Sequence, residues 1–458
     1  DSGVPGNSAI SESALSADLH VLADDSMGGR LVASSGLDQA SAWIADRFES
    51  LGLAPAGDRG GYFQRFGLAW FSLGVGNRLT VEGAGPGRTP GQGWTPSNAG
   101  ASGSASGSVV FAGFGIVEPR LDHDDYQGAD VNGRIVLMLE REPGVADPSS
   151  PFDGIVTAEA SRTWRKVLAA QERGATAVLF VRDVHNREDI NDWPAVHTGA
   201  WPDEPRRIER FTLEAWAEQI TIPAAQISAE LAATLVEGSG RTLEELAVEA
   251  ENAEGGLGVV DLGSARADLR TEVERHVSPG TNVLAMIEGS DPDLRDEVVI
   301  IGAHHDHNGM DGEVVYNGAD DDGSGTVGVL AIAEAYAQAA ASGDLPARSV
   351  IFAIWDAEER GLLGAWYYTQ RPLFPLQSTV ANLNMDMIGR HEEVPTDGGG
   401  RFRGLDVQSA ESNSNATNIL GYSYTPELVQ IVQDANRFDL TLRLRYDNSA
   451  SNLLRRSD

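Results

Sequence analysis

The feature that most constrains this chain is a series of three apolar segments, each ending in a polar cluster. The clusters are His304, His305, Asp306 and His307 after EVVIIGA, Glu358 and Glu359 after SVIFAIWDA, and Asp386 in NMDMIG after STVANL. Helical stretches separate the segments, a pattern typical of a parallel sheet covered by helices. Because ligands bind beyond the carboxyl ends of the strands in such sheets, we expect the three clusters to meet at one edge.

Three acidic residues stand in a row between the first two segments. The stretch NGADDDGSG contains Asp320, Asp321 and Asp322 and leads into the predicted helix TVGVLAIAEAYAQA. A helix N-terminus favours negative charge, but this offsets only part of the repulsion among three carboxylates. We therefore expect at least one of them to face a divalent cation. Oxygen and imidazole ligands suit zinc, cobalt or manganese, whereas an EF-hand calcium loop would need an acidic residue where Gly318 stands.

Each motif has an ordinary structural explanation when it is taken alone. HHDH can be a solvated loop, the two glutamates an exposed turn, Asp386 a capping residue, and NGADDDGSG a turn before a helix cap. One shared metal site explains all four motifs in this order, whereas the ordinary explanations require four coincidences.

Length and composition narrow the class of protein. A chain of 458 residues exceeds the size of a single hydrophobic core, so at least two domains are expected. Its net charge of −34 disfavours nucleic acid and anionic membranes as partners. Cysteine is absent, so a metal must be held by histidines and carboxylates. No apolar run reaches the ~20 residues that a membrane span needs. The sequence also lacks a G-x-S-x-G motif, and its single lysine, Lys166, lies outside any glycine-rich loop.

Changes in composition along the chain predict three regions. Residues 1–74 contain amphipathic helices and precede a tract rich in glycine, serine and proline. Residues 75–270 have strand and helix patterns of their own and are predicted to form a smaller, inserted α/β domain. Residues 271–458 carry the polar clusters. We predict that the first and last regions form one α/β domain, with a mixed, mostly parallel sheet covered by helices.

The four motifs GAHHDH, GADDDGSG, DAEERGLLG and NMDMIG together resemble those of a known family. They are similar to the motifs of the bacterial co-catalytic dizinc aminopeptidases, leucyl-aminopeptidase-like enzymes that share the fold of the zinc carboxypeptidases. The stretch FAGFGIVEPRLDHDDYQGADVNGRIVLMLEREPG resembles the protease-associated domain often inserted in that family. The resemblance implies a secreted or periplasmic enzyme that removes N-terminal residues from a peptide substrate. Two alternatives stay open: a dipeptidase or carboxypeptidase of the same fold, and a binding protein with a vestigial site.

The resemblance also assigns metal ligands. Of two divalent ions, expected to be zinc, one would be bound by His304 and Asp386 and the other by Glu359. Asp321 would bridge them. Two ions that share a carboxylate polarise a scissile carbonyl and lower the pKa of a water between them.

Other residues of the site would act on the substrate or on the ligands. Glu358 would be the general base, and Asp306 would accept a hydrogen bond from His304 and orient it. His305 and His307 are not predicted to be ligands. The resemblance further implies a cis peptide bond between Asp321 and Asp322.

The chain departs from the family pattern at its end. The family continues after Arg-Ser-Asp with a histidine and, some tens of residues later, a sixth ligand histidine, whereas the sequence printed here ends at Asp458. We therefore expect a missing C-terminal segment and a weakly occupied metal position at Glu359.

Overall fold

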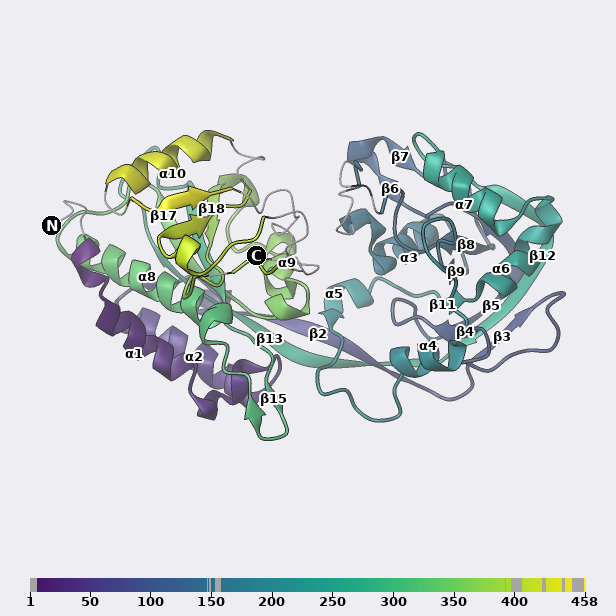
Figure 1. The fold of residues 1–458 in the computed structure, drawn as a ribbon, viewed down its shortest axis with the longest axis horizontal. Helices are drawn as coiled ribbons and strands as arrows, with labels where there is room; N and C mark the ends of the chain where they lie inside the picture. Colours follow the sequence, from purple (N-terminus) through teal and green to yellow (C-terminus); the bar gives the residue numbers. More distant parts are fainter. Residues whose placement is uncertain are drawn as a thin grey trace. The chain divides into compact units, whose positions relative to one another are not determined.

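The structure is a computed structural model. It describes residues 6–145, 147, 150–152, 158–391, 393–396, 406–421, 426–438, 441–446 and 457–458. By its contacts the chain divides into two compact units, Asp1–Leu68 with Ser278–Asp458, and Ala69–Val277 (Figure 1). The sequence analysis placed these boundaries after residues 74 and 270. Composition changes in loops, whereas the contact boundaries fall inside two long strands, β2 (Phe63–Leu73) and β13 (Val273–Ile287).

The first unit is built around a mixed sheet. Its strands run in the order β2, β13, β17 (Ser349–Trp355), β14 (Val298–His304) and β18 (Thr379–Asn384), and β1 (Ala54–Pro55) pairs with β13. Strand β14 is parallel to both of its neighbours, and β13 is antiparallel to β17. The predicted parallel arrangement of the three motif segments is therefore present, and their carboxyl ends lie at one edge.

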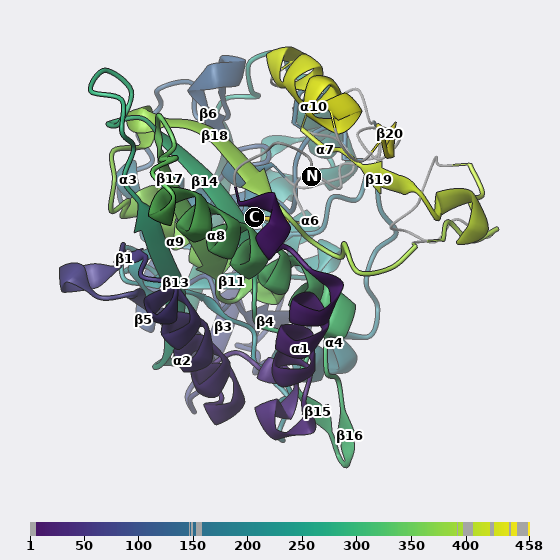
Figure 2. The same ribbon diagram turned by 90° about the vertical axis from the view of Figure 1, so that its left-hand side faces the viewer.

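Helices cover both faces of this sheet (Figure 2). Helices α1 (Glu12–Leu22), α2 (Ser35–Ser50) and α8 (Gly325–Ala341) pack in one core with Ile301 and Phe352, and α9 (Leu363–Gln370) packs in another with Ile300 and Ile351. Successive strand residues thus face opposite cores, which the alternation of side chains in a strand requires. Burial of each large apolar side chain contributes about 1.5–3 kcal/mol.

The sequence of α2 shows why a helix forms there. Ser34 caps its first turn by accepting a hydrogen bond from the N–H of Leu37 at 3.3 Å. The buried side chains of Leu37, Ile44 and Phe48 recur at helical spacing and form one apolar stripe. This stripe fixes the helix against the sheet that carries the polar clusters.

The second unit has a sheet of its own. Its order is β3 (Arg78–Val81), β12 (Val260–Thr271), β5 (Gly103–Phe111), β8 (Ile135–Leu139), β9 (Ala177–Val181), β11 (Ala224–Ile227) and β4 (Trp94–Pro96). Strands β5, β8, β9 and β11 are parallel. Helix α3 (Thr163–Glu172) packs on one face, and α6 (Ala229–Val236) and α7 (Leu243–Asn252) on the other. The unit is an α/β domain, and its likeness to a protease-associated domain stays a prediction.

Shorter elements complete the described chain. They are β6 (Val117–Glu118), β7 (His123–Asp124), α4 (Trp193–Ala200), β10 (Thr212–Leu213), α5 (Glu214–Ala217), β15 (Met310–Asp311), β16 (Val314–Val315), β19 (Ala416–Asn418), α10 (Pro426–Phe438) and β20 (Arg443–Arg445). Among the residues described, no helix combines the length and the apolar character needed to cross a bilayer.

Candidate metal centre

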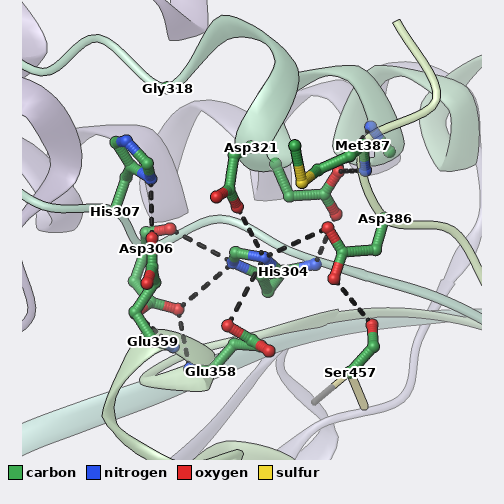
Figure 3. A network of polar contacts seen from close by, with 12 residues as sticks. His304, Asp306, His307, Gly318, Asp321, Glu358, Glu359, Asp386, Met387 and Ser457 are labelled. Atoms are coloured by element: carbon green, nitrogen blue, oxygen red, sulfur yellow. Dashed lines mark hydrogen bonds and ion pairs between the residues drawn. The ribbon is translucent and has the colours of Figure 1, made fainter. Parts of the chain in front are cut away.

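The carboxyl ends of β14, β17 and β18 bring the predicted site residues together (Figure 3). His304 is the last residue of β14, the turn Glu358–Arg360 follows β17, and Asp386 lies just beyond β18. The acidic turn Ala319–Ser324 leads into α8. The polar residues that follow the three apolar segments thus form a single cluster of side chains at one edge of the sheet.

One group of potential ligands consists of His304, Asp321 and Asp386, whose ligand atoms all lie within 4.8 Å of one another. Nε2 of His304 is 3.4 Å from Oδ1 of Asp321 and 3.9 Å from Oδ1 of Asp386. The imidazole is fully buried, and within the described chain its Nε2 makes no hydrogen bond. A buried imidazole nitrogen that faces two carboxylates fits a divalent metal ion.

A second group consists of His307, Asp321 and Glu359, again within 4.8 Å. Nδ1 of His307 lies 2.8 Å from Oε1 of Glu359, which also accepts a hydrogen bond from Nδ2 of Asn308 at 2.8 Å. His307, which was not predicted from the sequence to be a ligand, thus lies beside Glu359. The chain turns after β14, which brings His307 as well as His304 close to Asp321, and the two groups share that aspartate.

The three consecutive acidic residues point to different partners. Asp320 pairs with Nε of Arg390 at 2.7 Å, away from both histidines. The carboxylate of Asp322 is buried and accepts hydrogen bonds from the backbone N–H groups of His304, Gly325 and Met387. Only Asp321 faces the two groups of ligands. The peptide bond between Asp321 and Asp322 is cis, as predicted.

The electrostatics of the site favour positive charge. Burial alone lowers the pKa of His304, but contacts with the carboxylates of Asp306 and Asp321 outweigh it and raise that pKa well above its usual value. Burial raises the pKa of Glu358 to about 10, although the nearby imidazole opposes the shift. Oε2 of Glu358 is 3.6 Å from Nε2 of His304. These groups bind protons tightly when no other cation neutralises them, which is the behaviour expected of a metal-binding cluster.

Asp306 positions the turn that carries the glutamates. Its buried carboxylate accepts hydrogen bonds from the backbone N–H groups of Glu358 at 2.9 Å and Glu359 at 3.3 Å. From the sequence, this carboxylate is predicted to accept a hydrogen bond from His304. Nδ1 of His304 is nearer to the backbone carbonyl of Asp306, at 3.1 Å, than to its carboxylate, at 3.6 Å.

Arg30 supports the site and was missed by the sequence analysis. Its fully buried guanidinium donates to four backbone carbonyls, those of Leu22, His305, Asn317 and Gly318, over 2.6–2.8 Å. It thereby ties the end of β14 to the start of the acidic turn. An arginine beside two glycines in MGGR carries no pattern that reveals such a role.

The last two residues also reach the site. Oγ of Ser457 donates a hydrogen bond to Oδ2 of Asp386 at 2.8 Å (Figure 3). Burial raises the pKa of Asp458 to about 8. Their position adds one more hydrogen bond that orients the Asp386 carboxylate.

Fold and site together define an α/β protein with a candidate metal centre of histidines and carboxylates at the edge of its sheet. The family model described as peptidase family M28 matches residues 282–430, which contain both groups of ligands. This part of the chain, about a third of its length, is similar to peptidase family M28.

Individual relatives carry names from both kinds of exopeptidase. A probable glutamate carboxypeptidase of Arthroderma benhamiae is 29% identical over 325 residues, which are 63% of this chain and 40% of that protein. A probable leucine aminopeptidase 2 of Aspergillus oryzae is 34% identical over 135 residues, 28% of this chain and 24% of that one. The chain therefore spans less than half the length of either relative.

Among solved structures, an aminopeptidase from Aneurinibacillus sp. strain AM-1 aligns with a TM-score of 0.41 and 19% identity. The alignment covers 83% of this chain and 71% of that one. BSAP, a zinc aminopeptidase from Bacillus subtilis, aligns with a TM-score of 0.34 and 17% identity over 94% of this chain and 78% of its own.

Proposed function

We propose that this protein is a metal-dependent exopeptidase that removes N-terminal residues from peptides. The observation that carries the proposal is the pair of histidine and carboxylate groups that share Asp321, with the buried Glu358 beside them. A peptidase needs a polarising cation and a base within reach of the same carbonyl carbon, and this edge of the sheet holds candidates for both.

We further propose two divalent metal positions, with zinc as the metal. His304, Asp321 and Asp386 would hold one ion, and His307, Asp321 and Glu359 the other. The bound ions would supply Lewis-acid activation of the scissile carbonyl. Asp321, as the one residue common to both groups, would fix the separation of the two positions.

Glu358 is assigned the proton transfer. Its carboxylate would take a proton from the attacking water as the water oxygen bonds to the carbonyl carbon. It would then deliver that proton to the amine nitrogen as the carbon–nitrogen bond breaks. Asp306 keeps Glu358 in place through the backbone N–H group of the turn rather than through its side chain.

A dipeptidase or carboxypeptidase with the same machinery is the second candidate, favoured by the carboxypeptidase name of one relative. A binding protein with a vestigial site is less well supported, because two candidate ligand groups and the base lie together at this edge of the sheet. Location in the periplasm or outside the cell rests on the family resemblance alone, and cell fractionation tests it.

A substrate panel tests the proposal. Purified protein is incubated with zinc and aminoacyl-nitroanilides, N-acetylated peptides, C-terminally amidated peptides and free dipeptides. An aminopeptidase cleaves the nitroanilides and the amidated peptides and ignores the acetylated ones, whereas a carboxypeptidase shows the reverse preference for blocked ends. Absence of hydrolysis across the panel, with metal bound, would leave the binding protein as the better description.

A further inference from the structure

The second unit contains a polar pocket of its own, of about 420 Å³. It is lined by Arg141, which follows β8, by Phe180 of β9, and by Thr163, the first residue of α3. Strands β8 and β9 are parallel. The pocket therefore lies beyond the carboxyl ends of parallel strands, the position where open α/β sheets bind ligands.

The lining of this pocket is cationic in a chain whose net charge is −34. Five of its residues are basic and one is acidic, namely Arg141, Arg162, Lys166, Arg187 and Arg210 against Glu140. The acidic residue lies 3.8 Å from Arg187. Within the described chain, Arg141 and Arg210 form no ion pair, so their charges are available to a ligand.

Four carboxylates lie near Lys166 and offset part of this positive charge, those of Asp125, Glu140, Glu142 and Asp183. Asp125 accepts hydrogen bonds from the backbone N–H groups of Ile116 and Leu257, and Glu142 accepts one from that of Ala158. These carboxylates are thus used to hold loops together. The arginines on the pocket wall need another explanation.

The start of α3 adds donors without charge. No side chain caps this ten-residue helix, so its first backbone N–H groups lack an intrahelical acceptor. Ser161, just before the helix, is 3% exposed and lines the pocket, and its hydroxyl makes no hydrogen bond with any described residue. A buried hydroxyl without a hydrogen-bond partner lowers the stability of the fold. A ligand that accepts a hydrogen bond from this hydroxyl removes that cost.

Lys166 provides a further donor. Its Nζ donates to the carbonyls of Leu139 at 2.8 Å and Arg141 at 2.7 Å. An ammonium group has three N–H donors. Two are used by these carbonyls, and the third can donate to a ligand. Burial lowers the pKa of Lys166 to about 8, which leaves the side chain mostly protonated at pH 7.

We propose that this pocket is a binding site for a small oxyanion, a carboxylate or a phosphate, held by Ser161, the start of α3 and the surrounding arginines. The volume suits a molecule of about dipeptide size. The donors are a hydroxyl, backbone N–H groups and guanidinium groups, so they recognise the oxygen acceptors of a ligand. The rest of the ligand is selected only by the shape of the pocket. The proposal is independent of any peptidase activity.

The single lysine of the chain makes the test direct. In protein labelled with ¹³C at lysine Cε, Lys166 gives the only lysine signal. Titration with inorganic phosphate and, separately, with the dipeptide Glu-Glu should shift this signal in a saturable way. Saturation by either probe supports the proposal and identifies which oxyanion the site prefers, and no saturable shift with both probes overturns it.

Variants on the pocket wall test the assignment of the donors. Ser161→Ala and Arg210→Gln should each weaken binding by at least ~10-fold, because each removes a hydrogen bond to a charged ligand. Arg120→Gln, at a side chain that is 83% exposed in the same unit, should leave the affinity unchanged. Equal affinity of the two wall variants and the control would contradict the site. If a substitution alters the Lys166 signal in the absence of ligand, isothermal titration calorimetry on the same samples measures the affinity instead.

Discussion

At the scale of single residues, the three consecutive aspartates contact different partners. Asp320 is paired with Arg390, and Asp322 is used by backbone N–H groups. Asp321 alone is left to face both histidines. The repulsion among three adjacent carboxylates is relieved because each has a different cationic or N–H partner. Of the three, Asp321 is the candidate metal ligand, and Asp320 and Asp322 hold the turn.

Glu358 is the residue that separates catalysis from metal binding. Glu358→Gln keeps the shape of the side chain but cannot accept a proton, so we expect turnover to fall by at least ~100-fold with metal content unchanged. Steady-state kinetics and elemental analysis of the same preparation measure both. Glu313→Gln, at an exposed position, is the matched control. Near-normal turnover in the Glu358 variant would reject its assignment as the base.

His307 decides whether the position beside Glu359 holds a metal ion. His307→Gln removes the imidazole 2.8 Å from Glu359, and we expect the zinc content at saturation to fall from two ions per chain to about one. Elemental analysis after dialysis gives the count without any assay of activity. His391→Gln, at an exposed histidine, controls for loss of a surface ligand. An unchanged count of two in the His307 variant would show that another group completes that position.

At the scale of secondary-structure elements, the site depends on a buried arginine that joins three segments. Arg30 holds the ends of α1 and β14 and the acidic turn through four carbonyls. Burial lowers its pKa to about 10, so the guanidinium stays charged at neutral pH. Loss of the arginine would leave several of these carbonyls buried without donors.

Arg30→Lys keeps the charge but cannot reach four carbonyls in a planar array. We expect it to lower the free energy of unfolding by about 2–4 kcal/mol, since each unpaired buried acceptor costs about 1–3 kcal/mol. Urea unfolding of metal-free protein measures this. Arg59→Lys, in an exposed loop, should change stability by less than ~0.5 kcal/mol. A similar effect of both variants would mean that the four bonds add little.

Helix α3 carries a second buried cation, Lys166. Its titration should change the free energy of unfolding with pH. The pKa of Lys166 falls from 10.5 to about 8 in the folded chain because the side chain is buried. Between these two pH values the unfolded chain binds a proton that the folded chain does not, so stability should rise with pH across that window. The gain is about 3 kcal/mol at most, because a tenfold change in proton concentration corresponds to about 1.4 kcal/mol.

Lys166→Met removes this titrating group. The variant should lack the lysine's contribution between pH 8 and 10.5, and the difference in unfolding free energy between the two proteins should change with pH accordingly. Urea unfolding at several pH values measures it, and the Cε signal of Lys166 gives the pKa directly. A difference that is constant with pH would contradict a lowered pKa.

The elements also show what could be predicted from the sequence. Strands β14 and β17 and the residues at their ends were predictable because an apolar run followed by a polar cluster is a local pattern. The contact of His307 with Glu359 was not, because it depends on how the chain turns after β14. Arg30 lies 275 residues before His305, and no local pattern reports so distant a partner. The unit boundaries fall inside continuous strands, where composition does not change.

At the scale of the whole molecule, the chain combines two units with separate cores and a large excess of negative charge. In the first unit, several carboxylates lie around the buried His304, where burial makes negative charge costly. A bound cation lowers this cost only in the folded state, because the ligands come from segments far apart in sequence. We therefore expect metal binding and folding of the first unit to be coupled.

This coupling predicts a stability change that is confined to one unit. A metal present at 100 times its dissociation constant stabilises the folded state by about 2.7 kcal/mol, so removal with a chelator should lower the melting temperature of the first unit by roughly 5–10 °C. Hydrogen exchange should become faster in β14 and at the start of α8, and stay unchanged in β8 and β9. Zinc added in excess of the chelator should restore both measurements, and sodium at equal ionic strength should not. Equal loss of protection in the two units would contradict a metal centre confined to the first, because the candidate ligands all lie between residues 304 and 386.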